Sequence, residues 1–121
     1  MAVAVARLAA DKKAAEIIVL GVGEAVSYTD FLVIASGANT RQTRAIASEI
    51  QQKLKELKVR PTRVEGEAQG EWILIDYLFA VVHIFTPAAR DFYRLETLWG
   101  DVPRIELPDL TAEQLSDLAT K

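Results

Sequence analysis

The stretch Glu71–Asp101, which reads E-W-I-L-I-D-Y-L-F-A-V-V-H-I-F-T-P-A-A-R-D-F-Y-R-L-E-T-L-W-G-D, decides the fold of this chain. Its first half, residues 72–85, is almost entirely apolar, and fourteen residues are too many for one ordinary strand and too few for a membrane span. Asp76-Tyr77 marks a break, which predicts two strands over about 72–77 and 80–85. A strand that is apolar on both faces belongs inside a sheet covered by helices. The segment therefore predicts a central hairpin.

The second half of the stretch predicts a helix that packs back on this hairpin. Thr86 is a hydroxyl N-cap, and Pro87 follows at the first helical position, where its missing N–H costs nothing. A single apolar stripe continues at i, i+4, i+7 and i+11, formed by Ala88, Phe92, Leu95 and Trp99. We therefore expect one continuous helix that ends at Gly100.

The rest of the chain alternates between helical and strand patterns. Asn39 and Gln42 form a capping box, and Pro61 precedes a short exposed edge strand. Helices are predicted over 2–13 and 40–58, and strands over 17–22, 31–35 and 62–65. The order αββαβββα predicts a single α/β domain, with a mixed sheet of about five strands flanked by helices on both faces. The domain is expected to span 1–103, and 104–121 is a C-terminal tail that is either a short helix near Thr111 or disordered.

Composition bounds the functional class. The chain of 121 residues has no cysteine, which excludes disulfides, thiol nucleophiles and cysteine metal sites. Its beginning lacks the features of a secretion signal, so we expect a cytoplasmic protein without membrane contact. The net charge of −3 favours a basic protein as partner, with little direct nucleic-acid contact, because phosphate binding draws on a basic face.

No residue pattern predicts catalysis, a metal or a cofactor. His83 is the only histidine and lies among apolar strand residues, so we expect a structural, hydrogen-bonded side chain. Ser36-Gly37 lacks the further glycines and the lysine of a phosphate loop. Nucleotidyl transfer needs two carboxylates at i and i+2 of a strand, but the residue two positions after Asp30 is Leu32, which has no carboxylate. A nucleotide-binding or nucleotidyltransferase-related domain is the alternative function.

Three segments carry a resemblance to a known family. S-Y-T-D-F-L-V-I-A-S-G-A-N-T-R-Q (27–42), V-E-G (64–66) and most of 72–101 resemble the ribosomal silencing factor family, also called Iojap. The resemblance implies a nucleotidyltransferase-like fold without catalytic residues and a homodimer when free. It also implies a translation repressor that binds the large ribosomal subunit through its fourteenth ribosomal protein and blocks joining of the small subunit. Large-subunit maturation is a further role in the family.

The hairpin turn departs from the family pattern. A tight two-residue turn favours Gly and Asp, and the family has Gly-Asp here, whereas this chain has Leu78-Phe79. Two readings remain open: the turn has a different form, or two exposed apolar side chains belong to a contact surface.

Interface-type residues gather around the hairpin and the helix after it. Aromatic side chains and arginine dominate protein interfaces, and Arg94 lies off the apolar stripe, free to meet a partner. The resemblance is also densest here. The predicted partner-binding residues are Trp72, Asp76, Tyr77, Arg94, Leu98 and Trp99.

Overall fold

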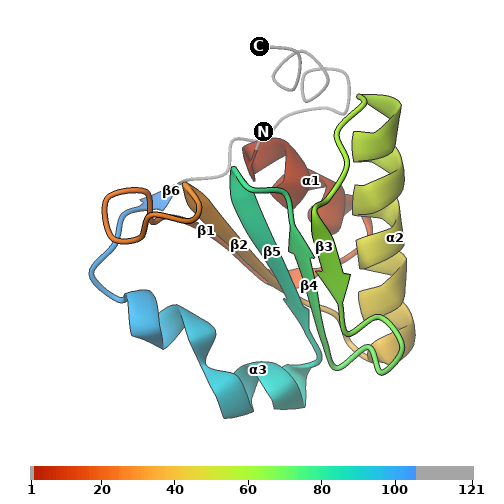
Figure 1. Cartoon of the computed structure of the whole chain (residues 1–121). Helices are drawn as coiled ribbons and strands as arrows, with labels where there is room; N and C mark the ends of the chain where they lie inside the picture. Colours follow the sequence, from red (N-terminus) through yellow and green to blue (C-terminus); the bar gives the residue numbers. More distant parts are fainter. Residues whose placement is uncertain (1, 106–121) are drawn as a thin grey trace.

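The computed structural model describes residues 2–105, which form one layered α/β unit (Figure 1). Its helices are α1 (Ala2–Asp11), α2 (Thr40–Glu56), α3 (Pro87–Tyr93) and the 3₁₀ helix η1 (Leu95–Trp99). Its strands are β1 (Ala15–Gly21), β2 (Phe31–Ser36), β3 (Arg63–Glu65), β4 (Trp72–Asp76), β5 (Ala80–Phe85) and β6 (Arg104–Ile105).

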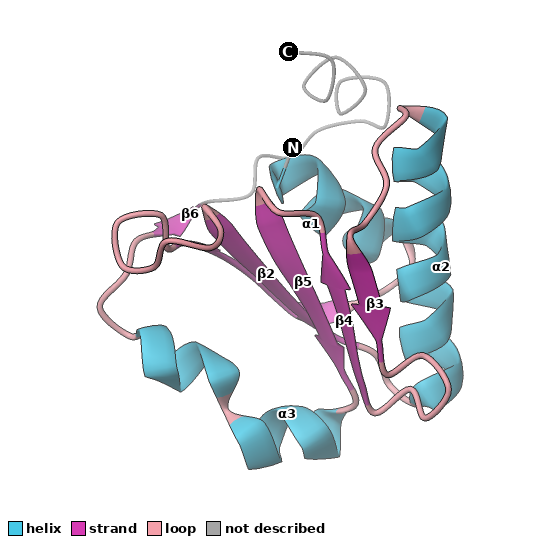
Figure 2. Ribbon diagram, in the orientation of Figure 1, coloured by secondary structure: helices cyan, strands magenta, loops and turns pink. Residues whose placement is uncertain are grey.

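The strands form one mixed sheet in the order β3-β4-β5-β2-β1-β6 (Figure 2). The central pair, β2 and β5, is parallel, with Ile34 opposite His83, whereas all the other pairs are antiparallel. All six residues of β5 are buried, which explains its unbroken apolar sequence. The predicted mixed sheet is confirmed, with six strands in the described part of the chain rather than about five.

One face of the sheet is covered by α1 and α2 (Figure 1). Alternate strand residues point to this face, where Ile73, Ile75 and Ile84 pack against Ile46 and Ile50 of α2. All five side chains are fully buried, with no exposed surface. At roughly 1.5–3 kcal/mol for each buried side chain of this size, this layer supplies most of the apolar stabilisation.

The opposite face is covered only in part, by α3, η1 and the connection between β1 and β2 (Figure 2). Leu20, Leu32, Ile34 and Phe85 are buried here, whereas Trp72 is only half-buried. The expectation of helices on both faces is therefore confirmed, but the two layers differ in extent.

The capping box predicted at the start of α2 links two helices. The Asn39 side chain accepts a hydrogen bond from the amide of Gln42 at 2.9 Å, as predicted. The Gln42 side chain accepts from the amide of Ala38 and donates to the carbonyl oxygens of Lys12 and Lys13. One glutamine thus satisfies polar groups at the end of α1 and at the beginning of α2.

The prediction of one continuous helix over 86–99 is wrong. Thr86 and Pro87 begin α3 as expected, but Arg94 adopts the left-handed conformation (φ 47°, ψ 49°) and separates α3 from η1. Phe92, assigned to the buried stripe, is 79% exposed, and Ala88 is exposed too. A straight helix would carry Leu95 and Trp99 away from the sheet, and the break returns both side chains to it.

The hairpin turn combines the two readings that the sequence left open. Leu78 has a positive φ of 71° and is 61% exposed, so the turn does place an apolar side chain in solvent. Phe79 instead packs against the core and stacks on Tyr77, with ring centroids 5.9 Å apart. The carbonyl of Phe79 also accepts hydrogen bonds from the amides of Asp30 and Phe31, which fixes the start of β2.

The sheet extends beyond the domain boundary expected at residue 103. Arg104 and Ile105 pair with Leu20 and Val19 at the outer edge of β1. The helix considered near Thr111 lies outside the described residues.

We predict that Leu78→Gly stabilises the protein by about 0.5–1 kcal/mol. The left-handed conformation costs a residue with a Cβ about 1–2 kcal/mol, and the greater freedom of glycine in the unfolded chain offsets part of the gain. Urea unfolding measures the change. Leu78→Val is the control, because a β-branched residue tolerates positive φ even less and should destabilise. Equal stability of the two variants would contradict the claim that the positive φ at residue 78 strains a side chain with a Cβ.

Candidate partner-binding surface

The incompletely covered face of the sheet carries the side chains that alternate with the core residues of β4 and β5. Trp72 lies opposite Phe85 across the strand pair, and Leu74 lies opposite His83. Leu74 and Trp72 are only half-buried, while Phe85 is fully buried. This face therefore presents partly accessible apolar side chains on a rigid strand pair.

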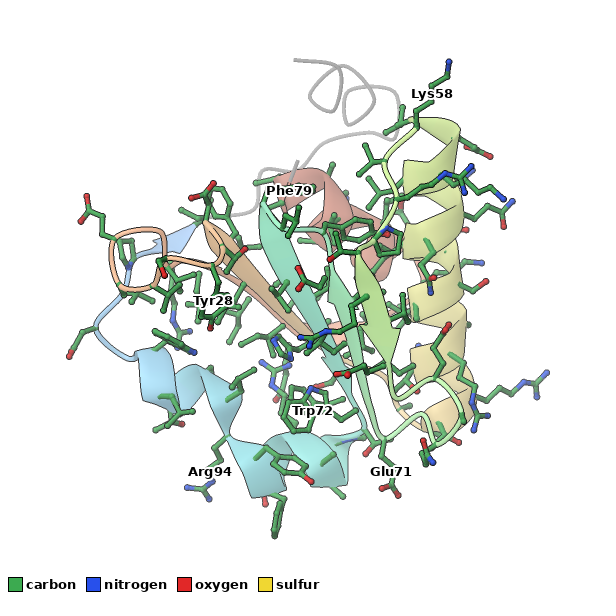
Figure 3. The ribbon with its side chains drawn as sticks, in the orientation of Figure 1. Tyr28, Lys58, Glu71, Trp72, Phe79 and Arg94 are labelled. Atoms are coloured by element: carbon green, nitrogen blue, oxygen red, sulfur yellow. The ribbon has the colours of Figure 1, made fainter. Side chains whose placement is uncertain are left out.

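Trp72 is the centre of an aromatic cluster between β4, β5 and α3 (Figure 3). Its ring centroid lies 4.5 Å from Tyr93, 5.1 Å from Phe85 and 5.9 Å from His83. Contacts at these separations are favourable beyond the area that they bury, by roughly 0.5–1.5 kcal/mol for each pair. Trp72 thus joins the helix α3 to the sheet.

His83 is held in one tautomer by Trp72. The indole Nε1–H of Trp72 donates to Nδ1 of His83 at 3.0 Å, so the neutral imidazole carries its proton on Nε2. The side chain is 7% exposed, and its burial lowers the pKa of His83 to about 4. The expectation of a buried, hydrogen-bonded histidine is confirmed.

Arg90 holds α3 and η1 on the sheet. Its guanidinium donates to Ser36 Oγ at 2.9 Å and to Glu96 Oε1 at 3.1 Å, and the residue is 5% exposed. Partial burial pushes the pKa of Glu96 upward, but a backbone hydrogen bond and the hydrogen bond and charge of Arg90 hold it below its usual value. The guanidinium is nearly buried while the Glu96 side chain is 24% exposed, so loss of Glu96 would leave a desolvated charge with one partner fewer. Arg90 therefore sets the position of η1.

The outer sides of α3 and η1, which Arg90 holds on the sheet, carry exposed side chains. Phe92, Tyr93 and Leu98 are 79%, 48% and 74% exposed. Arg94 projects outward between α3 and η1 (Figure 3), where it pairs with Asp91 at 3.8 Å while 71% of its side chain stays exposed. Large apolar side chains next to an accessible arginine form a typical protein-binding surface.

Four of the six residues predicted from the sequence lie on the partly covered face of the sheet or on the elements that cover it. Trp72 on β4 and Trp99 at the end of η1 are half-buried on the partly covered face, and Arg94 and Leu98 are exposed on the segment that covers it. We call the surface formed by Trp72, Phe92, Tyr93, Arg94 and Leu98 the aromatic rim.

Asp76 and Tyr77 lie elsewhere. Asp76 is at the far end of β4 from Trp72, about 13 Å along the strand, and its carboxylate accepts a hydrogen bond from the amide of Leu78. Tyr77 is 4% exposed on the face covered by the helices, where burial raises its pKa to about 12. The strand alternation places its side chain opposite to that of Trp72.

Sequence reasoning missed two features of this surface. The apolar stripe that predicts a buried Phe92 includes Leu95 and Trp99, which lie beyond Arg94, where the helix ends. Arg90 carried no local signal of its role, because its partners are Ser36, 54 residues earlier, and Glu96, in the next element. The polar Ser36 at the end of an apolar strand was the only available hint.

The structure offers no support for the alternative of nucleotidyl transfer. Leu32, at the position where a second carboxylate is required, is 2% exposed in the packed face of the sheet. Within residues 2–105, no group of three or more His, Cys, Asp or Glu side chains is placed to hold a metal ion. Also within these residues, no helix is long and apolar enough to cross a membrane.

We predict that His83 makes stability depend on pH in a defined window. Because burial lowers its pKa from 6.5 to about 4, the unfolded chain binds the proton more tightly, and stability falls as the pH drops from about 6.5 to about 4. The free energy of unfolding of wild type relative to His83→Gln should therefore decrease by up to about 3 kcal/mol over this window. The carboxylates titrate in both proteins, so their contributions cancel in the difference between the two free energies of unfolding. A difference that stays constant with pH would contradict the burial of the neutral ring.

The sequence matches one family along its whole length. The family model described as ribosomal silencing factor during starvation matches residues 1–121. A ribosomal silencing factor of Chromobacterium violaceum is 41% identical over 90 residues, or 74% of each chain. One from Halalkalibacterium halodurans is 39% identical over 97 residues, 80% of this chain and 83% of the relative. Mouse mitochondrial assembly of ribosomal large subunit protein 1 is 34% identical over 91 residues, 73% of this chain and 40% of that protein.

Solved structures share the fold as well. A crystal structure of a Chromobacterium violaceum protein has a TM-score of 0.77 at 34% identity and covers 93% of this chain and 92% of its own. A second, from Bacillus halodurans, has a TM-score of 0.76 at 35% identity, with coverages of 86% and 94%. The family model and the sequence relatives show that this chain belongs to the ribosomal silencing factor family, and the solved structures share its fold.

Proposed function

We propose that this protein represses translation without enzymatic activity, by binding the large ribosomal subunit and blocking the joining of the small subunit. The observation that carries the proposal is the aromatic rim, whose exposed apolar side chains suit a protein partner. Membership of the family supports the link to silencing, and the name of the mouse relative supports the link to the large subunit.

The direct partner in this proposal is the fourteenth protein of the large subunit. Arg94 follows the exposed Tyr93 and precedes η1, which carries the exposed Leu98, and arginine with aromatic and aliphatic side chains is the combination that anchors protein interfaces. Arg90 and Glu96 act on the contact indirectly, because they fix the orientation of η1 from beneath. Repression by such a contact is steric and requires no cofactor. We place this activity in the cytoplasm, with the ribosomes.

A homodimer is the proposed state of the free protein. The same apolar side chains that would meet the ribosomal protein are exposed in the single chain, and the exposed area at Phe92 and Leu98 favours self-association. Dimer and ribosome would then compete for the aromatic rim. An increase in monomer on titration with the isolated ribosomal protein would support this competition.

We predict that Arg94→Glu weakens binding to large subunits about thirtyfold, or about 2 kcal/mol. The effect on stability should stay below about 0.5 kcal/mol, because the Arg94 side chain is 71% exposed, and both its ion pair with the Asp91 carboxylate at 3.8 Å and its hydrogen bond to the Asp91 carbonyl at 3.1 Å are exposed to solvent. Co-sedimentation with purified large subunits measures the affinity, and the yield of joined ribosomes measures repression.

The control is Arg41→Glu, an identical charge reversal at an exposed position in α2, in the other helical layer. It should bind and repress as wild type does. An Arg94→Glu protein that melts normally and still prevents subunit joining would place the contact elsewhere on the molecule. Loss of binding in both variants would mean that overall charge, rather than the aromatic rim, governs the interaction.

A further inference from the structure

Positive charge is concentrated in one short segment of this acidic protein. Residues 53–63, K-L-K-E-L-K-V-R-P-T-R, contain five cationic side chains and one carboxylate, a net charge of +4. Because the whole chain carries −3, the remaining residues carry −7. We call residues 53–63 the basic segment. The negative net charge of the whole chain predicts little nucleic-acid contact. The basic segment is an exception, because its local charge is positive.

The basic segment covers the end of α2 and the connection to β3. The helix closes with hydrogen bonds from the amide of Val59 to the carbonyl of Leu54 and from the amide of Lys58 to the carbonyl of Lys55. Lys58 has a φ of 64°, at the position where helices usually place glycine. Its side chain projects from the tip of α2 away from the sheet (Figure 3).

The cations of the basic segment are largely available to a partner. Within residues 2–105, Lys55, Lys58 and Arg60 form no ion pair, and all three are exposed. Lys53 meets Glu56 and Arg63 meets Glu65, each at 4.0 Å and with side chains about half exposed. Exposed pairs at this distance contribute little and are readily exchanged for another anion.

The helix dipole explains only part of this charge. Cations in the last turn of a helix complement its free carbonyl groups, which accounts for Lys53 and Lys55. Arg60 and Arg63 lie beyond the helix, and the closing hydrogen bonds already satisfy the carbonyls of Leu54 and Lys55. The helix dipole therefore does not explain the positive charge at the end of the basic segment.

We propose that the basic segment is a second docking surface, which binds the phosphate backbone of RNA. This inference rests on the proposed function, because a ribosomal subunit presents RNA phosphate beside its proteins. Exposed lysine and arginine bind phosphate through charge and counterion release, without reading sequence. The RNA contact would add to the protein contact, because Lys58 and Arg94 lie in different parts of the molecule and leave both surfaces accessible (Figure 3).

The chain contains a matched control for this charge. Lys12 and Lys13 follow α1 as Lys58 follows α2, and Lys13 has a φ of 66°, against 64° for Lys58. Both helices close with the same pair of backbone hydrogen bonds. Asp11 and Glu16 flank the Lys12-Lys13 pair, so its local charge is balanced. Removal of two charges at either place changes the net charge of the protein equally.

The experiment compares Lys58→Gln/Arg60→Gln with Lys12→Gln/Lys13→Gln. Fluorescence anisotropy measures binding to an RNA duplex of about 20 base pairs, with salt varied from about 50 to about 200 mM. Wild type should bind with a salt-dependent affinity. The change at the basic segment should reduce the slope of log affinity against log salt by roughly 2, at about 0.9 for each lost phosphate contact. The control should keep the wild-type slope.

Three results would overturn the inference: no duplex binding by wild type, the same loss in both double variants, or equal competition by polyglutamate, which would indicate an acidic protein partner instead. Co-sedimentation with large subunits distinguishes this failure from failure of the proposed function. If only the RNA contact is wrong, the variant at the basic segment will bind subunits with an unchanged salt slope. If the aromatic-rim proposal is wrong, Arg94→Glu will bind subunits normally whatever the RNA result.

Discussion

The burial of β5 on both faces is the constraint on which the rest of the structure depends. Every side chain from Ala80 to Phe85 is buried, so the strand needs a neighbour on each edge and a layer on each face. β4 and β2 supply the edges, and α1 with α2 supplies a complete layer. Only short elements, α3 and η1, remain for the other face. The incomplete second layer leaves Trp72 half-buried and creates the aromatic rim.

A buried arginine makes this second layer possible. Apolar packing alone attaches η1 weakly, because Leu95 and Trp99 are only half-buried. Arg90 adds hydrogen bonds to the sheet at Ser36 and to η1 at Glu96, in a setting with little water. A buried charge of this kind is costly without its partners, so it specifies one position of η1 rather than simply adding stability. The exposed residues of the rim thereby gain a rigid support.

The molecule separates apolar contact surface from positive charge. The aromatic rim lies on the start of β4 and on α3 and η1, whereas the basic segment begins at the end of α2, in the opposite layer. A partner that combines protein and RNA surfaces offers a counterpart for each. Two separate contacts restrain orientation more strongly than one, because the second contact forms at a high effective concentration once the first is made. The steric repression that we propose would benefit from such a defined orientation.

Local patterns in the sequence by themselves determined much of this protein. The apolar run at 72–85 predicted the hairpin, Asn39 and Thr86 predicted the helix starts, and the ordered motifs of 27–101 identified the family. These features depend on neighbours within a few residues or on side-chain alternation, so they can be predicted from the sequence alone. Tertiary structure decided the rest. The break at Arg94 follows from packing on a distant sheet, and the pairing of Arg90 with Ser36 spans 54 residues. Whether Tyr77 or Phe92 meets solvent depends on which face a second layer covers, and a local period carries no information about that layer.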